Sequence, residues 1–292
     1  MELPVSIENI KILLGATAKT VPVIPTASNR KRSITGILNS ISQAEPSYLP
    51  AINALTVYPL MKWVLETRSG ADVSLGSAEE LLEKGPLPSR RNECFSYYEQ
   101  LCSLVEENVE KLKDVPEYGK KYYRAVADVH FGRDEKAVSI YQLNTHYRPA
   151  VELVCGWCGE RASELIEELN GAVSMDYSFS EEMSNPALEA AKRLIAFYPS
   201  SGKELRSLAE YGAASLENHP KDGPQLHRVM SAILEGVTSV DGLQQKIGLA
   251  WNTIARYRAE AINALGYLFW GYSCSELIYW LWEAQIEEQG RI

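Results

Sequence analysis

The stretch from 237 to 271, VTSVDGLQQKIGLAWNTIARYRAEAINALGYLFWG, decides the fold of the C-terminal part of the chain. A hydroxyl at Thr238 or Ser239 can cap a short helix by accepting a bond from one of its first backbone N–H groups. Gly248 follows that helix and supplies a residue that adopts positive φ without strain, as a tight turn requires. A longer helix then begins near Trp251. The stretch therefore predicts two helices joined by a tight turn.

The longer of these helices has two different sides. At helical spacing, an apolar set falls on one side and a set with an amide, a guanidinium and small residues falls on the other: Ile254, Tyr257, Ala261 and Leu265, against Asn252, Arg256, Ala259 and Asn263. Leu243 and Ile247 share a face of the shorter helix and can pack inward. This division suits a helix-turn-helix, in which the outer side of the second helix enters a groove of DNA.

The polar residues of this motif have distinct expected roles. Amide and guanidinium groups form bidentate bonds to base edges, so Asn252 and Arg256 are the predicted base contacts. The predicted phosphate contacts are Thr253, Lys246 and Arg228. Arg258 flanks the core side and is a DNA contact whose partner, base or phosphate, stays open.

The motif resembles the helix-turn-helix of sigma-factor region 4 and of phage late-gene regulators of the ArpU type. The residues that carry the resemblance are Leu243, Ile247 to Leu249, Asn252 to Ile254, Arg256 to Arg258, Ala261 and Ile262. The resemblance covers this stretch and the helix before it, not the first two hundred or so residues. It implies sequence-specific binding to double-stranded DNA and control of transcription, as in a phage or prophage regulator.

The charge of the motif is small. The chain carries a formal net charge of −9, which argues against a protein that coats nucleic acid without sequence preference. Between 221 and 271 there are five Lys and Arg residues against four Asp and Glu residues, a balance of +1. One copy should therefore bind weakly, which favours a homo-oligomer. The aromatic end of the chain, with Trp280 and Trp282 on an expected helix, is the predicted oligomer contact.

The composition fits a helical intracellular protein. Hydrophobic residues make up 46% and charged residues 23% of 292 residues, and no apolar run reaches the length of a membrane span. The N-terminus lacks the pattern of a signal peptide, so a cytoplasmic location is expected. The expected fold class is mainly α, a multi-helical scaffold with a C-terminal helix-turn-helix unit. The expected divisions are 1–33, a lead-in arm; 34–115, an N-terminal helical domain; 116–220, a middle helical domain; and 221–292, the helix-turn-helix with the aromatic helix.

The lead-in contains a dense basic cluster, Arg30, Lys31 and Arg32. It can be interpreted as an arm that contacts phosphates, or as a solvated loop before a helix.

The middle block offers a second, degenerate helix-turn-helix as a hypothesis. When it is aligned without gaps to the opening stretch at an offset of 104 residues, Arg124 matches Arg228 and Gly132 matches Gly236. Leu143 and Tyr147 then match the positions of Ile247 and Trp251; the alternative for this block is a strand over VSIYQLN.

Five cysteines without a signal peptide indicate reduced thiols, and Cys155 and Cys158 form a CxxC pair. On a helix these two thiols share a face and pack; a redox dithiol or half of a zinc site is the alternative. The four histidines are scattered singly, no nucleotide, hydrolase or metalloprotease motif is present, and no cofactor or metal is expected. The function predicted is therefore DNA binding by a non-enzyme. There are two alternatives: a helical module that binds a protein partner, and an enzyme that depends on the CxxC thiols.

Overall fold

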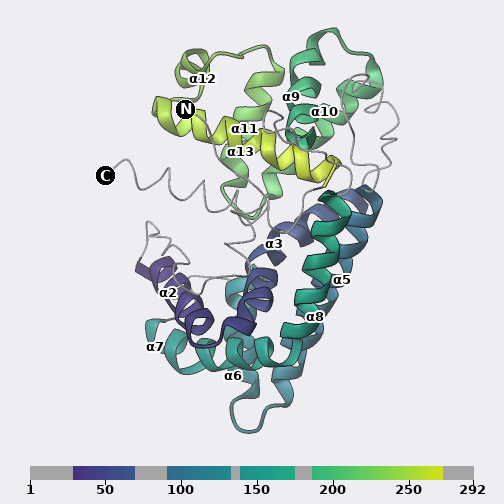
Figure 1. The fold of residues 1–292 in the computed structure, drawn as a ribbon. Coiled ribbons are helices and arrows are strands. Elements are labelled where there is room, and N and C mark those ends of the chain that lie inside the picture. Colours follow the sequence, from purple (N-terminus) through teal and green to yellow (C-terminus); the bar gives the residue numbers. More distant parts are fainter. Residues whose placement is uncertain (1–28, 70–90, 133–138, 175–185, 272–292) are drawn as a thin grey trace. The chain divides into compact units, whose positions relative to one another are not determined.

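The computed structural model of the chain describes residues 29–69, 91–132, 139–174 and 186–271 (Figure 1). Every regular element in these ranges is a helix, and no strand occurs within them. The expected mainly α fold class is therefore confirmed. None of the described helices combines the length and apolar character that a membrane crossing demands.

The chain divides into two compact units. Among the described residues, the first unit holds 29–61, 96–132 and 139–171, and the second holds the remainder. The boundaries expected at 115 and 220 each fall inside one of these units. Two long helices, α3 (Leu49–Ser69) and α5 (Arg91–Lys111), contribute residues to both units.

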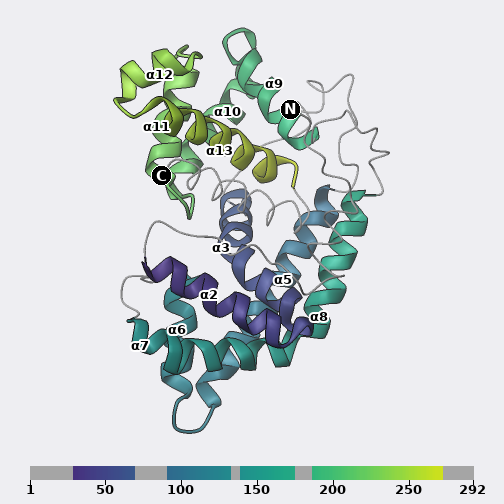
Figure 2. The ribbon, with the colours of Figure 1, turned by 60° about the vertical axis from the view of Figure 1, so that its left-hand side comes forward.

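The first unit is a bundle of helices from the N-terminal and middle parts of the chain. Besides the adjoining parts of α3 and α5 it contains α2 (Asn29–Ala44), the 3₁₀ turns η2 (Pro46–Tyr48) and η3 (Leu112–Asp114), α6 (Gly119–His130), α7 (Ile140–Gln142), the π-helical turn η5 (Leu143–Tyr147) and α8 (Arg148–Ser174). Within this unit α5 and α8 run side by side in both views (Figures 1 and 2). Fully buried side chains such as Leu55, Leu101 and Val151 form its core.

The second unit contains the predicted motif. Its helices are α9 (Pro186–Phe197), α10 (Lys203–Ser215), α11 (Gly223–Leu234), α12 (Val240–Ile247) and α13 (Trp251–Phe269), with the 3₁₀ turns η6 (Tyr198–Ser200) and η7 (Leu216–Asn218). α13 packs on α9 and α11, and α12 packs on both α11 and α13. α11, α12 and α13 therefore form a three-helix group, of which α12 and α13 are the helix-turn-helix.

The described residues of the middle block do not form a second helix-turn-helix. Residues 140–174 form one continuous helical run through α7, η5 and α8. At the offset of 104, the tight turn should have fallen near Asn144, yet η5 occupies this place. The strand alternative was also wrong, since the described residues of VSIYQLN are helical after Ser139.

The offset of 104 nevertheless marks a structural repeat. η3 and η7 are 104 residues apart, and so are the first and last residues of α6 and α11. Gly132 and Gly236, which follow these helices, both have positive φ, at 69° and 98°. Over 101–132 and 205–236, nine aligned positions are identical: Leu101, Ser103, Leu104, Glu106, Leu112, Pro116, Gly119, Arg124 and Gly132 in the first copy. The chain therefore carries two copies of a helix, 3₁₀ turn and helix unit.

A glycine starts the second helix of each copy for the same reason. A Cβ on Gly119 would lie 2.5 Å from the backbone oxygen of Leu112, and one on Gly223 would lie 2.4 Å from that of Glu217. The chain folds back so closely at this point that no side chain fits between the 3₁₀ turn and the helix.

Two further predictions concern the basic arm near the N-terminus and the aromatic helix near the C-terminus. The expected basic arm lies in the first turn of α2, because the backbone of Arg30, Lys31 and Arg32 is helical and does not form a loop. The aromatic segment with Trp280 and Trp282 lies outside the described residues.

Candidate nucleic-acid interface

The turn between α12 and α13 has the predicted geometry. The Ser239 side chain accepts a hydrogen bond from the Gly242 N–H at 3.1 Å and caps α12. Gly248 ends α12 with φ 79° and ψ 20°, and its N–H donates to the Gln244 carbonyl at 2.8 Å. A residue with a Cβ is strained in this left-handed conformation, which explains the glycine.

The inner side of the motif is also as predicted. Leu243 of α12 is fully buried, as are the four residues expected on the inner side of α13, Ile254, Tyr257, Ala261 and Leu265, each at 8% exposure or less. Ile247 is only half-buried at the end of α12. These contacts fix the angle at which α13 leaves the turn.

The outer side of α13 is open at its N-terminal end. Trp251 is 49% exposed, and Asn252 and Ala259 are exposed. Thr253 and Asn263 are half-buried. The N-terminal half of α13 thus presents an indole, an amide and a small residue, and the remaining predicted residues are less accessible.

Arg256 is not part of this exposed surface. Its side chain is only 10% exposed, its Nη2 atom lies 4.0 Å from Oδ2 of Asp222, and its guanidinium lies 4.7 Å from the centre of the Tyr257 ring. The positive charge is directed to the loop before α11. This placement argues against the base contact that the sequence predicted for Arg256 and gives it a role in packing α13.

The other cations of the motif are mostly engaged within the unit. Lys246 forms an ion pair with Glu235. Arg228 reaches the C-terminal end of α12, where Nη2 donates to the Ile247 carbonyl at 3.4 Å. Arg258 is half-buried and forms no hydrogen bond or ion pair with any residue that the structure describes. Lys246 and Arg228 must therefore exchange internal partners to contact phosphate.

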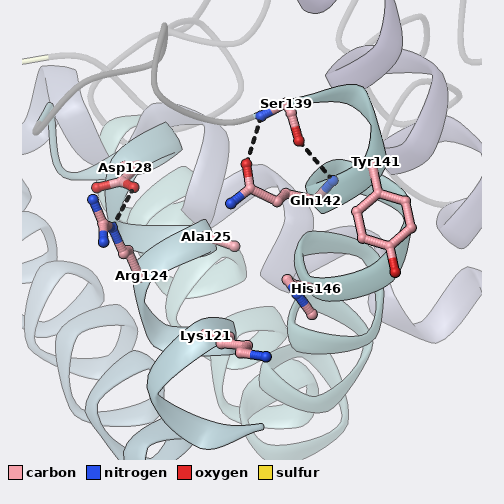
Figure 3. Close-up of a pocket in the computed structure, with 8 residues that line it drawn as sticks. All are labelled: Lys121, Arg124, Ala125, Asp128, Ser139, Tyr141, Gln142 and His146. Atoms are coloured by element: carbon pink, nitrogen blue, oxygen red, sulfur yellow. Dashed lines mark hydrogen bonds and ion pairs between the residues drawn. The ribbon is translucent and has the colours of Figure 1, made fainter.

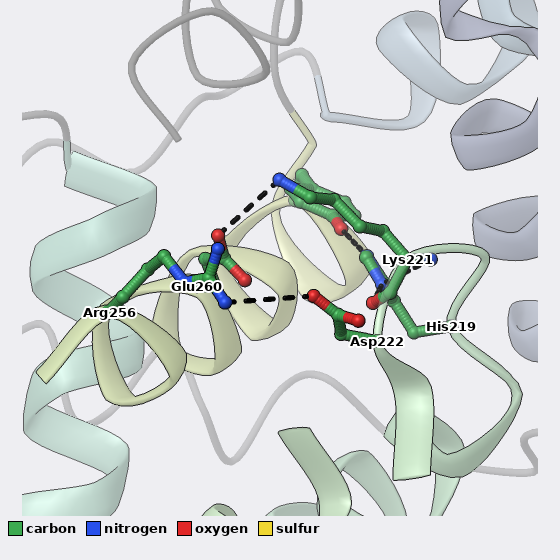
Figure 4. Close-up of polar contacts among 6 residues, drawn as sticks. His219, Lys221, Asp222, Arg256 and Glu260 are labelled. Carbon is green, nitrogen blue, oxygen red and sulfur yellow. Dashed lines mark hydrogen bonds and ion pairs between the residues drawn. The ribbon is translucent and has the colours of Figure 1, made fainter. Parts of the chain in front are cut away.

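A polar cluster lies between α13 and the loop before α11 (Figure 4). Nε2 of His219 is 2.5 Å from the hydroxyl of Tyr267, and Nδ1 of His219 is 2.8 Å from the Lys221 carbonyl. Nζ of Lys221 lies 3.5 Å from Oε1 of Glu260, whose side chain is only 4% exposed. Burial raises the pKa of Glu260, while the neighbouring Lys221 opposes this shift.

The sequence did not reveal this cluster, because it joins the loop before α11 to residues on the inner side of α13. Glu260 is one residue before Ala261 on that side, which is the one sequence signal that an acidic group faces inward. The cluster ties α13 to α11 and so helps to hold the orientation of the outer side.

The two buried histidines predict a loss of stability in acid. Burial lowers the pKa of His130 and His219 to about 4, from an ordinary value of 6.5. The unfolded chain then binds more protons than the folded one between these values, so stability falls as pH drops below 6.5 and levels off near 4. Each histidine should lower the free energy of unfolding by about 2–3 kcal/mol at pH 4.5 relative to pH 7. The raised pKa of Glu260 acts in the opposite direction.

Urea unfolding of the wild type and of His219→Gln at pH 7 and pH 4.5 isolates one of these contributions. The variant should lose about 2–3 kcal/mol less than the wild type over this interval. An identical loss in both proteins would show that His219 is not the buried neutral group described above.

The CxxC pair packs in the core of the first unit. Cys155 and Cys158 are buried on α8, and Sγ of Cys158 donates to the Val154 carbonyl at 3.1 Å. Burial raises the pKa of both thiols, that of Cys158 to about 11. Both thiols therefore stay protonated at neutral pH, which argues against a role as the reactive thiolate of an enzyme.

Within the described ranges, no group of three or more His, Cys, Asp and Glu side chains could hold a metal ion. Comparison with known protein families, with curated proteins and with solved structures finds no match to this chain.

Proposed function

We propose that the protein binds duplex DNA through α12 and α13, with the N-terminal half of α13 in the major groove. The observation that carries the proposal is the turn itself. It combines the features that a helix-turn-helix requires: the Ser239 cap, the left-handed Gly248 and the buried Leu243. The open first turns of α13 support it further, because residues near the N-terminus of a recognition helix are those that reach base edges.

Asn252 takes the main base contact in this proposal. Its amide is exposed at the second residue of α13, and an asparagine amide pairs bidentately with N6 and N7 of adenine. Ala259, two turns further on, lets the helix approach the groove closely. Thr253 and Arg258 are the proposed phosphate contacts, and Lys246 and Arg228 join them if they leave their internal partners.

Asn252→Ala should weaken binding to a duplex selected from a random pool by about 1–3 kcal/mol, because one bidentate base contact is lost. Asn263→Ala is the matched control, since it removes the same amide three turns further along α13. Fluorescence anisotropy of a labelled duplex measures both. Equal affinities of Asn252→Ala and the wild type would remove Asn252 from the proposed interface.

The proposed active form is a homo-oligomer that acts as a transcription regulator of the phage or prophage type. The support is the small charge of a single copy: of the five cations between 221 and 271, four have internal partners. Two copies on an inverted repeat would double the phosphate contacts without any further charge on the chain.

The same observation favours a second candidate, a module that binds a protein partner. An exposed Trp251 and few available cations fit a protein interface as well as a groove of DNA. Salt titration separates the two candidates, because phosphate contacts make the logarithm of the DNA affinity fall linearly with the logarithm of the salt concentration. A slope of about −1 to −3 per chain is expected from so few cations. If the protein does not bind DNA even at low salt, the module that binds a protein partner is favoured.

A further inference from the structure

A pocket of about 620 Å³ lies in the first unit, between α6 and the helical run that starts after Ser139 (Figure 3). Its volume is in the range of sites for small molecules. Figure 3 shows the ammonium of Lys121 and the amide nitrogen of Gln142 extending into the same space, beside Ala125 and His146. The residues of the pocket determine which chemistry it accepts.

The upper edge of the pocket presents hydrogen-bond donors. Ser139 and Gln142 cap the helical run reciprocally: Oε1 of Gln142 accepts from the Ser139 N–H at 2.8 Å, and Oγ of Ser139 accepts from the Gln142 N–H at 3.2 Å. Both bonds use the acceptor atoms of these side chains. The hydroxyl hydrogen of Ser139 and the NH₂ group of Gln142 are left to donate to a ligand.

The opposite edge carries positive charge. Arg124 lies 3.5 Å from the carboxylate of Asp128, which is 12% exposed, so these two charges balance one another. Lys121 is exposed and forms no ion pair with any described residue. Among the described lining residues the net charge is therefore positive, and none of them offers Lys121 a second carboxylate.

His146 adds a buried polar atom. Its Nδ1 is shielded from solvent and has no hydrogen-bond partner among the described residues. The residue sits in the π-helical turn η5, and such turns recur at functional sites because they displace side chains from the regular helical positions. A buried ring nitrogen without a partner is costly unless a ligand satisfies it.

The second copy of the repeat supplies an internal comparison. The counterparts of Lys121 and Arg124 at the offset of 104 are Gln225 and Arg228. There the arginine is satisfied internally, by Oε1 of Gln225 at 3.3 Å and by the last carbonyl of α12. In the first copy a lysine replaces that glutamine. The first copy thus holds a cation where the second holds a neutral capping contact.

We propose that this pocket binds a small oxyanion, through the phosphate or carboxylate group of a metabolite. Lys121 supplies the charge, and the Ser139 hydroxyl, the Gln142 amide and the His146 ring supply hydrogen bonds. This site lies in the first unit and does not depend on DNA binding.

The test is calorimetric titration of the full chain with inorganic phosphate and with acetate, at constant ionic strength set by chloride. Lys121→Ala removes the cation, and Lys120→Ala is the matched control because Lys120 is an exposed neighbour on α6 that does not line the pocket. Gln142→Ala is a second variant, and circular dichroism melting verifies that each variant is folded.

Saturable binding of phosphate or acetate to the wild type and to Lys120→Ala, weakened about tenfold or more in Lys121→Ala and reduced in Gln142→Ala, is the expected result. Which of the two probes binds more tightly decides between a phosphate and a carboxylate ligand. The absence of saturable binding to the wild type would overturn the proposal. So would an equal loss in the Lys120 and Lys121 variants, because it would indicate nonspecific attraction to a charged surface.

Discussion

Ala259→Glu is expected to abolish binding of the protein to its selected DNA site. Ala259 is exposed on the outer side of α13, two turns after Trp251. In the proposed complex, this part of α13 lies in the major groove. A glutamate at this position places a negative charge and four additional side-chain heavy atoms beyond Cβ near phosphates and base acceptors. Like-charge contacts across an interface cost several kcal/mol, so the affinity should fall by more than about 100-fold.

The matched control is Ala214→Glu, since Ala214 is also an exposed alanine on a helix of the second unit, at the end of α10. Both variants add the same charge to the chain, and glutamate is a good helix former, so neither should unfold the protein. Anisotropy titrations that show the same affinity for the two variants would place the interface elsewhere on the protein.

Gly223→Ala is expected to destabilise the protein by about 3 kcal/mol or more, because the added methyl group would collide with the backbone. The new Cβ would lie 2.4 Å from the backbone oxygen of Glu217 and 2.9 Å from that of Leu216. Backbone atoms in a 3₁₀ turn cannot move aside as the end of a side chain can. The helix α11 must therefore shift, and α12 and α13 pack on it.

Gly119→Ala tests the same contact in the first copy of the repeat and should have an effect of similar size, since its Cβ would meet two backbone oxygens at 2.5 Å. Gly171→Ala is the control: it lies on α8 with no atom within 4 Å of the added carbon, and the change should be neutral or stabilise by about 0.5–1 kcal/mol. Urea unfolding measures all three. Midpoints for the Gly119 and Gly223 variants that match the wild type would contradict the close approach.

The helix-turn-helix could be predicted from the sequence because its signals are local. Ser239 caps the helix that starts at the next residue, and Gly248 ends the same helix. The inner side of α13 follows from spacing alone, because residues three and four apart share a face. Such features need no knowledge of distant parts of the chain.

The position of Arg256 could not be predicted in this way. Helical spacing placed it beside Asn252, but its side chain bends to Asp222 in the loop before α11. That contact depends on how α11 and α13 pack, which is a tertiary property. The same holds for the ion pair between Lys221 and Glu260, in which burial of the carboxylate is offset by a partner far along the sequence.

Domain organisation was also beyond local signals. The expected boundary at 115 falls just before Pro116, which lies within the folded-back segment between η3 and α6, and Pro220 lies at the matching place in the second unit. Proline here ends one helix before a turn. The repeat, by contrast, is visible in the sequence, because nine positions of 101–132 are identical to those 104 residues later.

Selection of duplexes from a random pool by the full chain tests most directly whether α12 and α13 form a DNA-reading surface. We expect enrichment of a defined sequence whose binding weakens as salt is raised and is lost in Ala259→Glu but kept in Ala214→Glu. A pool that stays random after repeated rounds, together with no binding of any duplex at low salt, would contradict the claim.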